Sequence, residues 1–316
     1  MRVLKSLLAP ALLAVLLGGC GGSTRVESYA PNRIVVFGDE LSLIGTNGSK
    51  YSVNALKADA VSLDCATYPV WPQVVADGYG MVFSECNPTA VASPAGVMKA
   101  SVGATVADVV AAVSAFQASS TFTPQTLVTV MAGQHDILNA YKAYDAGTLS
   151  RALALSQVSA AGKALGALVN NVANQGSGGR VLYSTPPNLG YSPFAAAELV
   201  RTSDADRVTL LKELTLAFTA ALRLEVINDG RYAALITADE LTISMSDPTK
   251  MVSYALTNIV DQVCTVALPN CTTATMAAGA AGVGTAYLWA DAQHPGVSFQ
   301  SRVGLAALNR ARNNPF

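Results

Sequence analysis

Three short segments hold the side chains best suited to acid–base or nucleophilic chemistry. The chain has only two histidines: His135 precedes Asp136, and His294 follows Asp291 by three residues. Glu40 lies in the third segment, directly after a short apolar run. An imidazole changes its charge near neutral pH, and a nearby carboxylate can hold it in one tautomer. The spacing predicts that Asp291 orients His294.

The same side chains suggest a second kind of site. Glu40, His135 and His294 supply one carboxylate and two imidazoles, a ligand set that suits Zn²⁺ or Fe²⁺ with open positions for water. On this hypothesis the protein is a metal-dependent hydrolase. Asp291 would then hydrogen-bond to the ring of His294 without binding the metal itself. Apart from this alternative, we expect no cofactor.

Apolar runs and helical patterns alternate along the chain. Five apolar runs predict buried strands, at 33–37, 97–100, 127–131, 181–184 and 233–236. Apolar residues at helical spacing predict helices at 106–116, 149–174, 204–227 and 298–308. The alternation predicts an α/β fold, a three-layer α/β/α sandwich with a five-stranded, doubly wound parallel sheet. The stretches 45–98 and 245–286 are predicted to be largely irregular. Ligands of such folds bind outside the carboxyl ends of the strands, where the three chemical segments are predicted to lie.

Four segments at these predicted positions resemble, in order and spacing, the sequence blocks of SGNH/GDSL hydrolases. The family has Gly-Asp-Ser-Leu-Ser after its first strand, a glycine after its second, then Gly-x-Asn-Asp and a late Asp-x-x-His. The chain has Gly38-Asp39-Glu40-Leu41-Ser42, then Gly103, then Gly133-Gln134-His135-Asp136 and finally Asp291-Ala292-Gln293-His294. The resemblance covers residues 33–316, taken as one domain. It implies a hydrolase of small-molecule or lipid carboxylic esters.

The resemblance also implies a role for each matching residue. His294 would take up and return the nucleophile's proton, with Asp291 holding its ring. The N–H of Gly103 would bind the oxyanion, helped by the side chain at position 135, with Gly133 also at the pocket.

Two positions depart from the family pattern. Glu40 stands where the family has its nucleophilic serine, and His135 stands where it has asparagine. Attack by a glutamate on an ester would give an anhydride, and losing the nucleophile of such a triad costs roughly a factor of 10⁶ in rate. Ser42 is a possible substitute nucleophile. Asp39 and Asp136 are expected to be structural, accepting N–H groups at helix starts.

These departures leave several functions open. The protein could be an ester hydrolase with an altered mechanism, or a non-catalytic protein that binds an acylated lipid or glycan. It could also be the metal-dependent hydrolase described above. A carboxylate is a competent nucleophile at saturated carbon, so Glu40 could attack there. In the simplest case, Glu40 forms an ion pair with His294 and raises its pKa.

The first residues predict a lipid anchor. Arg2 and Lys5 precede an apolar run, 7–17, that is too short to span a bilayer. The run ends in Leu17-Gly18-Gly19-Cys20, which resembles a bacterial lipobox. We therefore expect a signal peptide at 1–19 and a lipidated Cys20 with a flexible tether at 20–32. By resemblance to known sorting rules, this places the protein in the bacterial cell envelope, with the outer membrane favoured.

Cysteine content and charge narrow the picture further. Four cysteines remain besides Cys20, and an even number in an oxidising compartment indicates two disulfides. Of the three possible pairings we favour Cys65–Cys86 and Cys264–Cys271, because short loops close easily. The formal net charge is −1, which offers a polyanion no attraction, so nucleic-acid binding is not expected. We expect a monomer.

Overall fold

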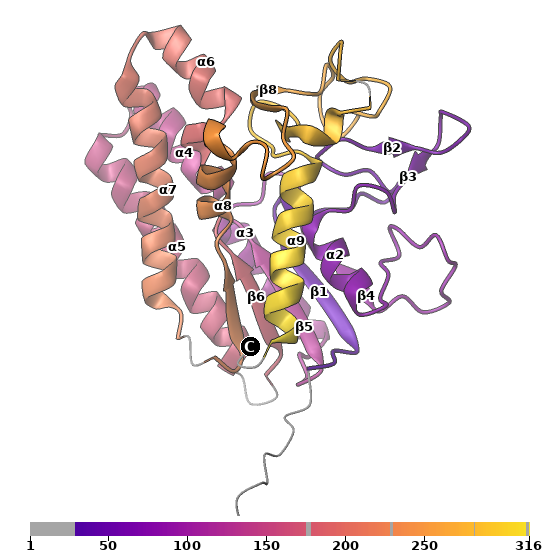
Figure 1. The fold of residues 1–316 in the computed structure, drawn as a ribbon. Helices are drawn as coiled ribbons and strands as arrows, with labels where there is room; N and C mark the ends of the chain where they lie inside the picture. Colours follow the sequence, from indigo (N-terminus) through magenta and orange to yellow (C-terminus); the bar gives the residue numbers. More distant parts are fainter. Residues whose placement is uncertain (1–28, 175–177, 228–229, 281, 314–315) are drawn as a thin grey trace, which may run out of the picture.

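The computed structural model describes residues 29–174, 178–227, 230–280, 282–313 and 316. Figure 1 shows helices packed around a central sheet. The predicted signal peptide, the lipobox and Cys20 lie outside the described residues.

Five parallel strands form the central sheet, in the order β4-β1-β5-β6-β7. Their bounds are Arg33–Gly38 (β1), Gly96–Met98 (β4), Thr126–Met131 (β5), Arg180–Ser184 (β6) and Ala233–Ile236 (β7). Every residue of β5 is buried, as expected of a central strand covered on both faces. The order turns back at β1, so the sheet is doubly wound, as the sequence predicts.

Helices cover both faces of the sheet and complete the three layers (Figure 1). One core cluster joins the sheet to α3 (Val106–Ser119), α4 (Gln134–Asp145), α5 (Arg151–Asn174) and α7 (Ala205–Glu225). The other joins it to α2 (Trp71–Gly78), α8 (Ala238–Met245) and α9 (Val297–Arg312). The predicted α/β/α sandwich is therefore confirmed.

The four predicted helices correspond to α3, α5, α7 and α9. Helices α2, α4, α6 (Pro193–Thr202) and α8 occupy segments where no helix is predicted. Both α2 and α6 carry a proline in the first turn, where no intrahelical N–H bond is needed.

The two stretches predicted to be irregular hold short elements. The first contains α2 and an antiparallel pair, β2 (Ala55–Leu56) and β3 (Leu63–Asp64). The second contains β8 (Asn258–Gln262), which pairs in parallel with β9 (Tyr287–Trp289). Four 3-10 helices lie at Glu40–Ser42 (η1), Leu189–Tyr191 (η2), Pro248–Lys250 (η3) and Gly284–Ala286 (η4).

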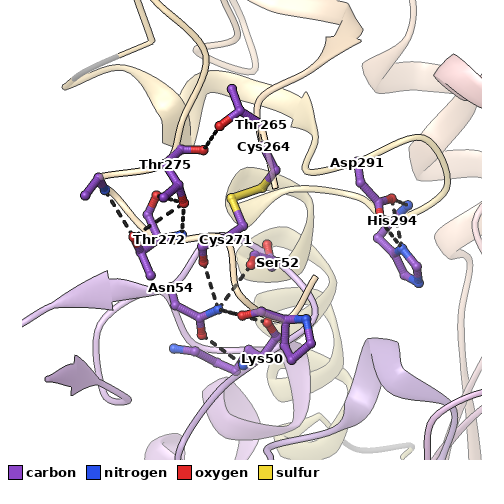
Figure 2. The surroundings of a disulfide bond; sticks show 12 residues. Lys50, Ser52, Asn54, Cys264, Thr265, Cys271, Thr272, Thr275, Asp291 and His294 are labelled. Atoms are coloured by element: carbon purple, nitrogen blue, oxygen red, sulfur yellow. Dashed lines mark hydrogen bonds and ion pairs between the residues drawn. A yellow bond between two sulfur atoms is a disulfide. The ribbon is translucent and has the colours of Figure 1, made fainter. Parts of the chain in front are cut away.

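Disulfides close loops in both stretches. Cys65 is bonded to Cys86, and Cys264 to Cys271, so both predicted pairings are confirmed. The second bond lies close to the loop that carries Asp291 and His294 (Figure 2).

Helix α5 is the single helix of the described ranges that is long and apolar enough, by length and composition alone, to cross a membrane. Its residues Ala154, Val158, Leu165 and Val169 are fully buried in the core cluster that also contains α7. This helix therefore packs inside the fold.

Candidate active site

The carboxyl end of β1 turns sharply before it presents Glu40. Gly38 has a φ of +142°, and a Cβ there would lie 2.2 Å from the carbonyl oxygen of Met131 in β5. Only glycine fits this close approach. The next residue, Asp39, caps η1 by accepting the N–H of Leu41 at 3.1 Å. The tight turn directs Glu40 into the protein, where its side chain is 3% exposed.

Glu40 makes hydrogen bonds to three other segments. Its Oε1 lies 2.7 Å from Nε2 of His135 and 2.9 Å from Nε2 of His294. Its Oε2 accepts the N–H of Gly103 at 2.8 Å. The four segments that carry the family resemblance therefore meet at this one carboxylate.

Asp291 holds His294 from the other side. Nδ1 of His294 lies 2.8 and 2.9 Å from the two carboxylate oxygens of Asp291, and Asp291 also accepts the N–H groups of Gln293 and His294. An ionised carboxylate can only accept, so a proton belongs on Nδ1. Glu40 makes the same demand on Nε2. His294 therefore sits between two acceptors and is suited to the doubly protonated imidazolium form.

The pKa shifts at the site also favour the imidazolium form of His294. Burial lowers the pKa of His294, but hydrogen bonds to Asp291 and Glu40 outweigh it and raise the pKa to about 9. The hydrogen bond to Glu40 also raises the pKa of His135. Burial alone would raise the pKa of Glu40, but the two imidazoles and the Gly103 N–H hold it below the usual range. At neutral pH the site therefore pairs ionised carboxylate with imidazolium.

Asp39 is the exception among these acids. It is fully buried, and burial together with the neighbouring charge of Glu40 raises its pKa to about 7. Its Oδ1 caps η1, whereas its Oδ2 has no hydrogen-bond partner among the described residues. Its role is structural, as predicted, and it is mainly the neutral acid only below about pH 7.

Helix α4 presents His135, and two neighbouring residues fix that helix. Gly133 has a φ of +115°, and a Cβ there would lie 2.3 Å from Cζ of Phe218. Asp136 accepts the N–H of Val106, the first residue of α3, at 2.9 Å. Because α3 follows the Gly103 loop directly, this bond fixes His135 relative to Gly103.

Ser42 has a different role from the one proposed for a substitute nucleophile. It is fully buried, and its hydroxyl accepts the indole N–H of Trp71 at 3.0 Å. Two residues at η2 are likewise held by structural contacts. Asn188 is buried and caps η2 through the N–H of Gly190, and Tyr191 lies under the ammonium of Lys212, 4.2 Å from the ring centre.

Tyr51 is a neighbour of the site that sequence reasoning missed. Its ring centre lies 5.9 Å from that of His294, with the planes tilted by 51°. Burial and the charge of Glu40 raise its pKa. Tyr51 belongs to the stretch predicted to be a surface excursion, and no motif marked it.

A buried clamp holds the Tyr51 loop in place. The amide of Asn54 donates to the carbonyls of Lys50, Pro269 and Cys271 at 2.9–3.0 Å, and its oxygen accepts the N–H of Lys50 at 2.8 Å (Figure 2). The N–H of Cys264 in turn donates to Ala290, the residue before Asp291. One disulfide loop therefore links the Tyr51 segment to the His294 segment.

The metal-dependent alternative does not fit these contacts. Within the described ranges, no group of three or more His, Cys, Asp or Glu side chains is arranged to hold a metal ion. Both Nε2 atoms instead lie at hydrogen-bond distance from the same oxygen of Glu40. A metal requires each Nε2 to lose its proton, and the raised pKa of His294 opposes that loss.

Comparison with known proteins gives structural matches only. No family model and no curated protein matches the chain. Among the solved structures, a member of the lipolytic protein G-D-S-L family from Veillonella parvula has 10% identity and a TM-score of 0.40, covering 88% of this chain and 96% of that chain. An extracellular lipase from Streptomyces rimosus has 13% identity and a TM-score of 0.47, covering 89% and 99%. The acetylxylan esterase Axe2 from Geobacillus stearothermophilus has 13% identity and a TM-score of 0.45, covering 92% and 98%.

The structure of the chain itself agrees with the resemblance predicted from the sequence blocks. The strand order and the meeting of the four blocks at the carboxyl edge of the sheet confirm that resemblance as a likeness of fold. At these identities the matches assign no activity to the chain.

Proposed function

We propose that this chain is an ester-hydrolase-like protein whose hydrolytic centre is closed by its own Glu40, and that it binds an acylated lipid or glycan without cleaving it. One observation carries the proposal: a single carboxylate takes the hydrogen bonds of His135, His294 and the Gly103 N–H. In an active site of this design, those donors serve the nucleophile and the developing oxyanion.

The position of each Glu40 oxygen supports closure. Oε1 lies against the imidazole that would activate a serine, and Oε2 occupies the backbone donor that would stabilise an oxyanion. A permanent negative charge at this place repels the oxyanion of an ester transition state. The site therefore lacks a nucleophile and has no free donor at Gly103.

Attack by Glu40 on saturated carbon is also disfavoured. Three donors surround its two oxygens, and its pKa lies below the usual range. A carboxylate that is this well stabilised is a weak nucleophile. The same bonds would have to break before Glu40 could reach a substrate.

The edge of the site suits an acyl group. Val102, beside Gly103, is 56% exposed, and the partly exposed ring of Tyr51 lies against His294. These side chains offer apolar surface next to Gly103 and His294, while Glu40 itself is buried. On this proposal, the acyl group binds to this apolar surface and Glu40 does not react with it.

The test compares the wild type with Glu40→Ser, and each of these with and without His294→Ala, on short- and medium-chain p-nitrophenyl esters. The wild type should show no turnover that depends on His294. Glu40→Ser should gain weak, His294-dependent turnover and react covalently with a fluorophosphonate at position 40. The gain should be small, because the exchange of asparagine for His135 removes an oxyanion donor worth roughly 3 kcal/mol.

Two results would count against the proposal. Robust wild-type turnover that disappears in Glu40→Gln would make Glu40 catalytic. Binding is measured by the fluorescence of the two tryptophans during titration with a lysophospholipid or an acetylated xylo-oligosaccharide. A wild type that responds to neither ligand would remove the binding half of the proposal.

A further inference from the structure

Residues 50–54 form a loop that is held at both of its ends. The N–H of Lys50 donates to Oδ1 of Asn54 at 2.8 Å, and Nδ2 of Asn54 donates back to the carbonyl of Lys50 at 3.0 Å. The other residues of the loop are buried, and Tyr51 alone is partly exposed. The loop therefore fixes Tyr51 at the surface of the protein, where its ring centre lies 5.9 Å from that of His294.

The side chain of Lys50 is fully buried, which is uncommon for a lysine. Its Nζ donates to the carbonyl oxygens of Cys65 at 3.1 Å and of Thr67 at 2.6 Å. No salt bridge among the described residues includes Lys50. Burial lowers the pKa of its ammonium to about 8, although the charge of Asp64 opposes the shift. An apolar side chain would fill this space without the cost of burying a charge, so the two carbonyl contacts are what the lysine contributes here.

The first of these carbonyls belongs to a disulfide cysteine, because Cys65 is bonded to Cys86. The same carbonyl accepts a hydrogen bond from Nε2 of Gln73 in α2 at 3.2 Å. The chain just before Lys50 also packs on this disulfide, since a Cβ at Gly48 would lie 2.9 Å from Cβ of Cys65. The Cys65–Cys86 disulfide therefore holds the carbonyl to which the buried ammonium donates.

The other end of the loop contacts the second disulfide. The backbone N–H and Nδ2 of Asn54 both donate to the carbonyl of Cys271, at 2.9 and 3.0 Å (Figure 2). Cys271 is bonded to Cys264. Each disulfide thus holds one end of the loop that carries Tyr51.

We propose that Lys50 is a positioning residue that couples the Cys65–Cys86 disulfide to the ring of Tyr51. Reduction of this disulfide then changes the surroundings of His294. Once the bond is broken, the segment that carries the Cys65 carbonyl is no longer tied to Cys86. The end of the Lys50 side chain loses its fixed partners, and the loop can carry Tyr51 away from His294.

Access favours reduction of this disulfide first. Cys65 is partly exposed, whereas Cys86 is buried, as are both cysteines of the second disulfide. The thiolate of a dithiol forms a mixed disulfide with Cys65 and releases Cys86, and its second thiol then releases Cys65. The dithiol becomes a cyclic disulfide, and the protein gains two electrons and two protons as two thiols.

The consequence for ligand binding rests on the function proposed above, in which Tyr51 offers part of the apolar surface for an acyl group. The consequence for the ring contact rests on the structure alone. The ring of His135 provides an internal reference, because its hydrogen bond to Glu40 does not involve the loop. The experiment therefore measures the ring contact and the binding separately.

Nuclear magnetic resonance observes the ring contact through the nuclear Overhauser effect between Tyr51 and His294. The protein is the chain from residue 20 onward with Cys20→Ser, so that the two disulfides hold all of its remaining cysteines. Every buried apolar core residue that the structure describes lies within 34–316, so this form keeps the core.

A substitution tests the role of Lys50. Lys50→Met keeps the length of the side chain but removes its donors. Most of the effect between the two rings should therefore be lost, while the ring signal of His135 stays unchanged. Lys57→Met, at an exposed lysine just beyond the loop, is the matched control and should behave as the wild type.

Reduction tests the coupling in the wild type. A dithiol is added until peptide mapping shows Cys65 and Cys86 as thiols and the second disulfide intact, and the effect between the rings should then be lost as in Lys50→Met. The same treatment of Lys50→Met should change little more, because the two changes interrupt one path. Cys65→Ser combined with Cys86→Ser removes the bond without a reductant and should give the same result.

Binding is measured with the lysophospholipid titration described above. Reduction should weaken binding about five-fold, and so should Tyr51→Ala, since the contact of one aromatic ring contributes roughly that factor. A wild type that does not bind the lysophospholipid counts against the proposed function, and the ring contact still decides the role of Lys50.

Three outcomes would overturn the inference. One is a folded Lys50→Met variant that keeps the full effect between the rings. Another is loss of the Cys65–Cys86 bond, by reduction or by substitution, without any change at His294. The third is collapse of the signals of both histidines together, since the disulfide would then hold the whole fold rather than the loop. If Lys50→Met does not fold, the loss of the disulfide decides between these outcomes.

Discussion

Charged side chains are stabilised differently at the two ends of the central sheet. At the carboxyl end, the carboxylates of Glu40 and Asp291 are matched by the two histidines of the chain. At the amino end, the guanidinium of Arg180 lies against the rings of Tyr29 and Phe316, and no salt bridge among the described residues includes it. At one end opposite charges pair directly, while at the other the guanidinium of Arg180 lies against two ring faces.

The difference bears on the function proposed for the carboxyl end. Family-like groups at the carboxyl end remain in place, yet Glu40 uses their hydrogen-bonding capacity. On the proposed function, these hydrogen bonds stabilise the fold and do not serve catalysis. At the amino end, the cation–π contacts of Arg180 are expected to contribute less to stability. The two ends should therefore respond differently to mutation and to pH.

The largest effect is expected at the closed end. Glu40→Ala leaves two imidazoles and the Gly103 N–H without their acceptor, so the free energy of unfolding should fall by about 3–5 kcal/mol. Urea unfolding at pH 6 measures the loss. Glu40→Gln keeps the shape and one acceptor oxygen, so it should lose less. If both variants were as stable as the wild type, the cluster would contribute nothing and the comparison would fail.

The next largest effect is expected from pH, which should change the stability contributed by the carboxyl end. His294 has a folded pKa of about 9 against a usual value of 6.5, so its stabilisation is fully present below pH 6.5 and is lost as the pH rises through 9. Between pH 7 and pH 10 the loss should be about 2–3 kcal/mol. Glu40 acts in the other direction: its lowered pKa gives stability above pH 4.5 that is lost on acidification.

Nuclear magnetic resonance can measure the pKa values of the two histidine rings directly, because the chain has only two histidines and both lie in the site. Both ring signals should titrate above pH 6.5, with His294 the higher. Glu40→Gln should lower both pKa values. Ordinary titration of both rings near pH 6.5 in the wild type would mean that the ion pairs are absent in solution.

The clamp beneath the closed end should have an intermediate effect. Asn54→Ala removes the amide that joins Lys50 to Pro269 and Cys271, leaving buried N–H and C=O groups without a partner. We expect a loss of about 2 kcal/mol in unfolding free energy. Because Tyr51 lies between Lys50 and Asn54, the ring signal of His294 should shift as well. A loss of stability with no change at His294 would show that the clamp serves the fold alone.

The sequence predicted the sheet well, because β1, β5, β6 and β7 are short apolar runs that both layers of helices bury. It predicted α5 and α7 for the same reason: long apolar patterns leave few alternatives. It missed α2, because Trp71-Pro72 reads as a break in structure although proline fits a first turn. It missed α4, because the N-cap residue Gly133 has no side chain that could cap the helix.

The sequence predicted which residues meet at the site, but it did not predict the hydrogen bonds between them. Order and type of residue were enough to bring Glu40, Gly103 and His294 to one edge of the sheet. The donors that each oxygen of Glu40 accepts depend on the backbone geometry of the turn at Gly38 and of η1. Differences of a few ångströms decide these contacts, and the sequence spacing does not predict them. Tyr51 reaches His294 through contacts between residues far apart in sequence, and these left no local pattern.

The smallest effect is expected at the amino end. Arg180→Met keeps most of the length of the side chain but removes the charge between Tyr29 and Phe316. Cation–π contacts at such half-exposed places contribute about 1 kcal/mol, so stability should fall by roughly that amount. A guanidinium stays charged throughout the ordinary pH range, so the loss should be the same at pH 6 and pH 9, unlike the losses at Glu40 and His294. Arg180→Lys keeps the charge without the planar group that stacks on both rings, and it should recover only part of the loss. If Arg180→Met instead destabilised the protein as strongly as Glu40→Ala, the guanidinium would have to be neutralised inside the fold. The contrast between a closed and an open end of the sheet would then be wrong.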